Sequence, residues 1–168
     1  KVIPATLEHV VLGAKMGDGV TVFGETAIRD YKGVIKNLFL VPDNCSPVAD
    51  TITAIMNADA VVIGPGSLYT SIIPNLLVNG VAEAIANSSA STFYVSNIMT
   101  EKGETDGFTV FDHLDVINSH IGENIVDYAV VNAGIIDKLR LERYEAEKAV
   151  PVKVDTDNIP KMGIEVIR

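Results

Sequence analysis

The sequence has 168 residues, about the length of one domain, so we expect a single core. Its 48% hydrophobic and 21% charged residues are typical of a folded globular protein and exclude the disordered and collagen-like classes. The formal net charge of −9 argues against nucleic-acid binding, which needs a basic surface. Cys45 is the only cysteine, which excludes an internal disulfide and a thiolate metal cluster, and we expect a cytoplasmic protein.

The apolar runs and the two ends of the chain bear on its location and extent. No apolar run approaches the roughly 20 residues of a membrane helix, so we expect no membrane span. No basic segment followed by an apolar one opens the chain, as it would in an export signal. The chain starts with Lys1, and a strand-like pattern at 163–167 continues to Arg168, so we expect a portion of a longer protein.

The first segment, residues 6–30, is predicted to form an antiparallel hairpin that acts as a small flap. Apolar and polar residues roughly alternate over 6–15 and again over 20–25. Gly17 and Gly19 lie between these two runs and supply the backbone freedom that a tight hairpin turn requires.

A buried strand is predicted at 60–63, after a short strand at 35–41 and a helix at 47–57. Ser46 and Pro47 suit the start of that helix, because serine is a good N-cap and proline is tolerated at the first helical position. The run at 60–63 is Ala-Val-Val-Ile, which is typical of a strand buried on both faces in a parallel sheet.

Helices and strands alternate through the rest of the chain. Strands are predicted at 92–95 and 128–131, and helices near 71–78, 81–87, 110–121 and 137–147. Because proline is tolerated only in the first helical turn, Pro74 places the start of the first of these helices near Thr70 or Ser71. The alternation predicts one α/β domain over residues 1–168, with a mainly parallel sheet flanked by helices and preceded by the antiparallel hairpin insertion.

The most specific local feature is the loop Gly-Pro-Gly-Ser-Leu-Tyr-Thr-Ser at 64–71, which directly follows the predicted buried strand. Open α/β sheets bind ligands at such carboxyl ends of strands. The backbone N–H groups and hydroxyls of the loop are predicted to bind an anion such as phosphate. Its candidate ligand-binding residues are Gly64, Gly66, Ser67, Thr70 and Ser71. The alternative is a plain strand-to-helix turn in which Ser71 only caps the helix.

Polar residues also follow the next two predicted strands. They could hydrogen-bond a base, a ribose or a sugar, whose hydroxyl groups need both donors and acceptors. The candidates are Asn97, Thr100, Thr105, Asp106 and Gly107 in the first loop, and Asn132 in the second. The alternatives are a solvated loop, with Thr109 capping the helix that follows, and a plain turn at 132–134.

We assign no catalytic residue and no metal ligand from the sequence. His113 and His120 are seven residues apart, about two helical turns, which is too far to chelate one metal ion without a third ligand. The aspartates show no ligand spacing of their own. No residue stands out as an acid, a base or a nucleophile.

Two long motifs and two short ones carry a resemblance to a known superfamily. The long ones are A-D-A-V-V-I-G-P-G-S-L-Y-T-S-I-I-P-N-L-L-V (58–78) and Y-V-S-N-I-M-T-E-K-G-E-T-D-G-F (94–108). The short ones are V-I-P-A-T (2–6) and D-G-V-T-V-F-G-E (18–25). Together they resemble the CofD-like superfamily, and within it the bacterial branch called gluconeogenesis factors. That branch often has cysteine at the position of Ser96 and glutamine at that of Glu101.

The resemblance implies a Rossmann-like, three-layer α/β fold in which this chain is the C-terminal portion. The superfamily's Gly-Gly-Gly-Thr-Gly phosphate loop, which lies near the start of the complete proteins, does not occur in these 168 residues. The chain would then supply the second wall of the ligand cleft, formed by the loops at 64–71 and 97–107 and by Asn132.

The two branches imply different functions. The gluconeogenesis factor branch implies a UDP-sugar-binding regulatory protein that affects carbon metabolism and cell shape. The other implies a magnesium-dependent 2-phospho-L-lactate transferase, and a scaffold without a ligand is a third reading. Transferases usually carry S-N-P-V-x-S after Gly-Pro, whereas this chain has G-S-L-Y-T-S at 66–71, which favours the regulatory branch. We therefore expect binding without turnover, a nucleotide ligand with magnesium as an optional cofactor, a homo-oligomer, and regulatory protein partners.

Overall fold

The computed structural model describes residues 1–155 and 157–168, and its centre is a four-stranded parallel sheet. The strands lie in the order β4-β5-β6-β7, and all three neighbouring pairs are parallel. Their bounds are Ala60–Ile63 for β4, Ser91–Val95 for β5, Tyr128–Val130 for β6 and Glu165–Ile167 for β7. This arrangement confirms the predicted α/β fold with a parallel sheet.

A second, three-stranded antiparallel sheet has the order β2-β1-β3. It consists of β1 (Val11–Met16), β2 (Thr21–Phe23) and β3 (Ile35–Val41). The predicted hairpin is confirmed, and the third strand has the bounds that its apolar pattern predicted. The flap also contains a helix that the sequence pattern did not reveal, α1 (Glu25–Asp30). Gly24, with φ +89, ends the β2 segment and precedes that helix.

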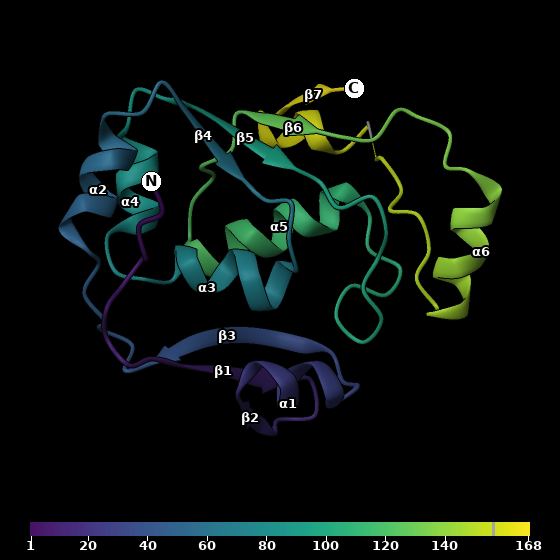
Figure 1. The fold of residues 1–168 in the computed structure, drawn as a ribbon, viewed down its shortest axis with the longest axis horizontal. Coiled ribbons are helices and arrows are strands. Elements are labelled where there is room, and N and C mark those ends of the chain that lie inside the picture. Colours follow the sequence, from purple (N-terminus) through teal and green to yellow (C-terminus); the bar gives the residue numbers. More distant parts are fainter. Residues whose placement is uncertain (156) are drawn as a thin grey trace.

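Helices lie between the two sheets, so the layers are sheet, helices, sheet (Figure 1). The helices of this middle layer are α3 (Ile73–Leu76) and α5 (Val110–Ile121), and a π-helical turn, η1 (Leu68–Ile72), leads into α3. At one end of the molecule lie α2 (Ala49–Met56) and α4 (Val81–Asn87), and at the other lies α6 (Lys138–Ala146) (Figure 1). A short 3-10 helix, η2 (Ile159–Met162), precedes β7.

The helical segment after β4 begins earlier than predicted. We expected its start near Thr70 or Ser71, whereas helical backbone begins at Leu68. The carbonyl of Ser67 accepts from the N–H groups of both Ser71 and Ile72, so one wide turn precedes the regular helix. Pro74 is the second residue of α3, and α3 directly follows this wide turn.

The environment of β4 also differs from the prediction. We expected Ala60–Ile63 to be buried on both faces, but β4 is an edge strand of the parallel sheet and the side chain of Val62 is 60% exposed. On the same face, the rings of Phe93 and Tyr128 stack with centroids 4.9 Å apart. The outward face of this sheet therefore carries apolar side chains together with the exposed Ser91 and Glu165, and the core lies against its other face.

The core fills the space between the inward face of the parallel sheet and the antiparallel sheet. Tyr94 and Ala129 contribute from the parallel sheet, Leu114 and Ile117 from α5, and Leu38 from β3, and each is at most 2% exposed. The burial of apolar side chains such as these is the main source of stability in a single domain. No single helix in the described residues is long and apolar enough to cross a membrane, and only the bent pair Leu68–Leu76 and Val81–Asn87 reaches that length together.

Two local devices fix α5 in this middle layer. Thr109 and Asp112 form a reciprocal capping box at its N-terminus, so two otherwise unpaired N–H groups find acceptors. Near its C-terminus, the ring of His120 accepts a hydrogen bond from the backbone N–H of Leu38, at 3.0 Å. That bond joins α5 directly to β3, and it connects residues 82 positions apart in the chain.

Candidate functional site

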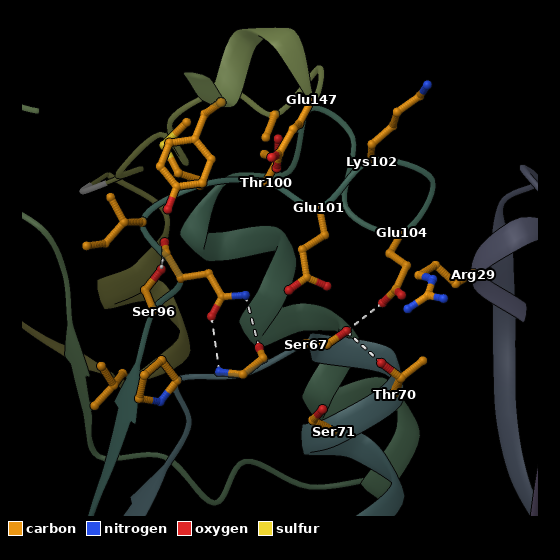
Figure 2. A pocket seen from close by; sticks show the side chains of 18 of the residues that line it. Arg29, Ser67, Thr70, Ser71, Ser96, Thr100, Glu101, Lys102, Glu104 and Glu147 are labelled. Atoms are coloured by element: carbon orange, nitrogen blue, oxygen red, sulfur yellow. Dashed lines mark hydrogen bonds between the residues drawn. The ribbon is translucent and has the colours of Figure 1, made fainter. Parts of the chain in front are cut away.

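A cavity of about 690 Å³ lies at the carboxyl ends of β4 and β5. Its volume falls in the range of small-molecule sites. The loops that follow β4 and β5 line the cavity (Figure 2). Helix α1 borders it from the antiparallel layer, and residues of the segment at 144–149 line another side. The sequence placed the site at these strand ends, and the cavity is found there.

The loop after β4 is held in one shape by a glycine and an asparagine. Gly64 has φ +84, and a Cβ atom there would lie 2.9 Å from the carbonyl oxygen of Val95, so a side chain is excluded on two grounds. The amide of Asn97 clips the loop to the end of β5, because its Nδ2 donates to the Gly66 carbonyl at 2.9 Å and its Oδ1 accepts from the Gly66 N–H at 3.3 Å.

Three side chains form a hydrogen-bonded chain in the cavity (Figure 2). Thr70 Oγ1 donates to Ser67 Oγ at 2.8 Å, and Ser67 Oγ donates to Glu104 Oε2, also at 2.8 Å. Figure 2 shows the carboxylates of Glu101 and Glu104 both directed toward Ser67, while Lys102 extends away. The hydroxyl of Ser67 is thus oriented by its neighbours and faces acidic groups.

Glu104 has the most strongly perturbed environment in the cavity wall. Burial raises the pKa of its carboxyl above the ordinary value, and the nearby charge of Glu101 raises it further, while Ser67 and Arg29 oppose the shift. Burial together with the charge of Glu104 raises the pKa of Tyr69 to about 12, so that phenol stays neutral. A buried carboxyl beside a hydroxyl group is an arrangement suited to hydrogen-bonding or to accepting a proton.

The charges around the cavity are mainly negative. The acidic side chains that line it are Glu25, Glu101, Glu104 and Glu147, and the basic ones are Arg29 and Lys102. Two N–H groups of the predicted anion loop already have acceptors, since Gly66 donates to Asn97 and Ser71 donates to the Ser67 carbonyl. Anion binding by this loop stays a prediction. The acidic side chains give the cavity more hydrogen-bond acceptors than a site for phosphate alone would carry.

Six of the predicted ligand-binding residues line this cavity. They come from the two segments that follow β4 and β5, and Thr70 and Ser71 lie within η1: Gly66, Ser67, Thr70, Ser71, Asn97 and Thr100. Thr100 also pairs with the C-terminal segment, since its Oγ1 accepts from the N–H of Val150 at 3.0 Å. Their roles toward a ligand stay predictions.

The other five predicted residues are not among those lining the cavity. Gly64 gives the loop after β4 its backbone conformation. Thr105 is fully buried, and its hydroxyl accepts a hydrogen bond from the N–H of Glu101 at 2.8 Å. Asp106 accepts from the Gly103 N–H at 2.7 Å and lines a neighbouring cavity of about 300 Å³. Gly107 has φ +75 in a turn, and Asn132 bonds within its own turn, to Gly134. Gly64, Thr105 and Asp106 therefore hold the shape of the two loops that carry the wall, while Asn132 lies in a separate turn.

Several residues of the cavity wall are not among those predicted from the sequence. Arg29 and Glu25 belong to the unpredicted helix α1, while Tyr144 and Glu147 belong to α6 and its end. Glu101 and Glu104 were within the predicted loop, and their spacing of three residues was the signal that could have singled them out as a carboxylate pair.

The histidines have structural partners. Nδ1 of His113 donates to the Thr109 carbonyl at 2.8 Å, and Nδ1 of His120 donates to the Val116 carbonyl at 2.7 Å. Within residues 1–155 and 157–168, no three His, Cys, Asp or Glu side chains are grouped as a metal ion would require. These residues therefore do not by themselves fit a resident magnesium ion, and we derive no step through one.

Comparison with known proteins places this chain in a family. A family model described as 2-phospho-L-lactate transferase CofD matches residues 1–168. The chain belongs to the CofD family. The crystal structure of a Bacillus halodurans protein superposes with a TM-score of 0.96 at 44% identity, over 99% of this chain and 54% of that one. The match confirms the resemblance on which the predicted fold partly rested.

Curated relatives of the bacterial branch expected from the motifs are similar to nearly the whole chain. The Gluconeogenesis factor of Bacillus subtilis is 44% identical over 168 residues, covering 100% of this chain and 53% of that protein. The Gluconeogenesis factor of Halalkalibacterium halodurans is also 44% identical, over 99% of this chain and 52% of that protein. The chain is thus a gluconeogenesis factor homologue that spans about half the length of these relatives.

Proposed function

We propose that the chain forms one wall of a nucleotide-sugar site in a cytoplasmic regulatory protein of the gluconeogenesis factor type, which binds a UDP-sugar and affects carbon metabolism and cell shape. The observation that carries the proposal is the cavity of about 690 Å³ at the ends of β4 and β5, where hydroxyl, amide and carboxylate groups face one space. A nucleotide sugar needs this mixture of partners, because its many hydroxyls both donate and accept.

Two further observations support the regulatory reading. The relatives named Gluconeogenesis factor are 44% identical to this chain over nearly its whole length. The loop sequence G-S-L-Y-T-S at 66–71 differs from the S-N-P-V-x-S pattern of the transferases of the superfamily. Both favour binding over catalysis.

A magnesium-dependent transferase is the second candidate, and one observation favours it. Glu101 and Glu104 lie in the same cavity, and the pKa of Glu104 is raised by burial while Ser67 donates to its carboxylate. Such a carboxyl could take or give a proton during group transfer. The family model that matches is also described by a transferase activity.

Incubation of the full-length protein with UDP-N-acetylglucosamine, with and without magnesium, separates the two candidates. The bound and free nucleotides are then analysed by chromatography. We expect stoichiometric retention of the intact ligand. Repeated turnover to a new product would establish the transferase, and no retention at millimolar ligand would remove the nucleotide-sugar proposal.

A further inference from the structure

We propose that Glu104 selects the sugar of the ligand, its buried carboxylate accepting hydrogen bonds from sugar hydroxyls at the Ser67 side of the cavity. This inference rests on the proposed function and deepens it, because it assigns the neutral polyhydroxylated part of the ligand, and not its phosphates, to the loop after β4.

The geometry at Glu104 suits a hydroxyl acceptor. The residue is only 8% exposed and lines the cavity, and the structure gives Ser67 as the donor to Oε2. An ionised carboxylate has about four lone-pair positions, so acceptor capacity remains for a ligand. Thr70 donates to Ser67 and thereby fixes the direction of the Ser67 hydroxyl. The acceptor is therefore oriented before the ligand arrives, which lowers the entropic cost of binding.

The electrostatics at the same place disfavour a phosphate. Figure 2 shows Glu101 directed to the same point as Glu104, and Lys102 pointing away from it. A phosphate beside Ser67 would meet two carboxylates at short range, and like charges in a partly desolvated cavity repel strongly. A sugar hydroxyl carries no charge and gains a charge-assisted hydrogen bond instead.

The backbone of the loop leads to the same assignment. The N–H of Gly66 already donates to Asn97, and the N–H of Ser71 to the Ser67 carbonyl, so these donors are not free to wrap a phosphate. Arg29 lies on the α1 side of the cavity, close enough to lower the pKa of Glu104.

Calorimetric titration of the full-length protein with UDP-N-acetylglucosamine and with UDP tests the assignment. The variants are Glu104→Gln, which keeps the size of the side chain and its bond to Ser67, and Glu165→Gln, a matched change on an exposed strand residue. We expect the wild-type protein and Glu165→Gln to bind the nucleotide sugar at least about tenfold more tightly than UDP. In Glu104→Gln most of this difference should disappear, through weaker binding of the sugar nucleotide and unchanged or tighter binding of UDP.

The outcomes separate this inference from the proposed function. Equal binding of UDP and UDP-N-acetylglucosamine by the wild-type protein, or an equal loss of both in Glu104→Gln, overturns the assignment and leaves nucleotide binding standing. If neither UDP nor UDP-N-acetylglucosamine binds the wild-type protein, the proposed function and this inference are both overturned. Thermal unfolding of each variant, measured in parallel, shows whether a loss of affinity comes from a loss of folded protein.

Discussion

Replacing His120 by leucine removes an acceptor that joins the helical layer to the antiparallel sheet. The N–H of Leu38 on β3 donates to Nε2 of His120 on α5 at 3.0 Å, while Nδ1 of the same ring donates to the Val116 carbonyl. Leu38 is only 2% exposed, so water cannot readily take the place of the lost acceptor. Leucine fills most of the volume of the imidazole ring. The main defect in His120→Leu is therefore the N–H of Leu38, which has lost its acceptor.

The expected cost follows from that defect. A buried donor without a partner destabilises a protein by roughly 1–3 kcal/mol. The edge-to-face contact between the rings of His120 and Tyr69, at 6.3 Å, adds a smaller loss. For a chain of this size, about 2 kcal/mol corresponds to a fall of about 4–8 °C in the melting temperature.

Urea and thermal unfolding of the wild-type protein, His120→Leu and His9→Leu measure this cost. His9 is exposed, so the same chemical change there should alter the free energy of unfolding by less than about 0.5 kcal/mol. If His120→Leu were as stable as His9→Leu, the bond between α5 and β3 would not contribute to stability, and the reasoning would be refuted.

The stability of the protein should also fall with acidification. Burial lowers the pKa of both His113 and His120 below the ordinary 6.5, so the folded state binds protons on these rings less readily than the unfolded state does. Stability is therefore full above pH 6.5 and decreases as the pH falls from there through the folded-state pKa values. In His120→Leu the decrease should be shallower, and an unchanged slope would contradict the buried, neutral state of that ring.

Two further predictions concern the loop after β4 and the start of α5. Gly64→Ala should destabilise the protein by about 1–3 kcal/mol more than Gly107→Ala, because both have positive φ but only the first would clash, with the carbonyl of Val95. Equal losses in urea unfolding would disprove the clash. Thr109→Ala should cost about 1 kcal/mol by breaking the capping box, whereas Ser119→Ala on the exposed side of α5 should cost little, as chemical denaturation can measure.

Most of the local elements and the class of the fold could be predicted from the sequence alone. The bounds of β3, β4, α4 and α5 agree with the prediction because apolar periodicity and capping residues act over a few neighbouring positions. The alternation of strands and helices was likewise enough to predict a parallel sheet, and the polar residues after β4 and β5 placed the cavity at the ends of those strands.

The contacts between residues far apart in the chain could not be predicted, because they depend on how the layers pack. Apolar composition could not reveal that β4 is an edge strand with Val62 exposed, because the neighbours of a strand depend on sheet order and not on its own sequence. Glu104 lies 37 residues from Ser67, and α1 brings Arg29 to the same cavity from the other sheet. Spacing along the chain carries information over a helical turn or a strand pair, whereas contacts between layers form when the whole core packs, and those contacts set the burial of Glu104 and the neutral state of His120.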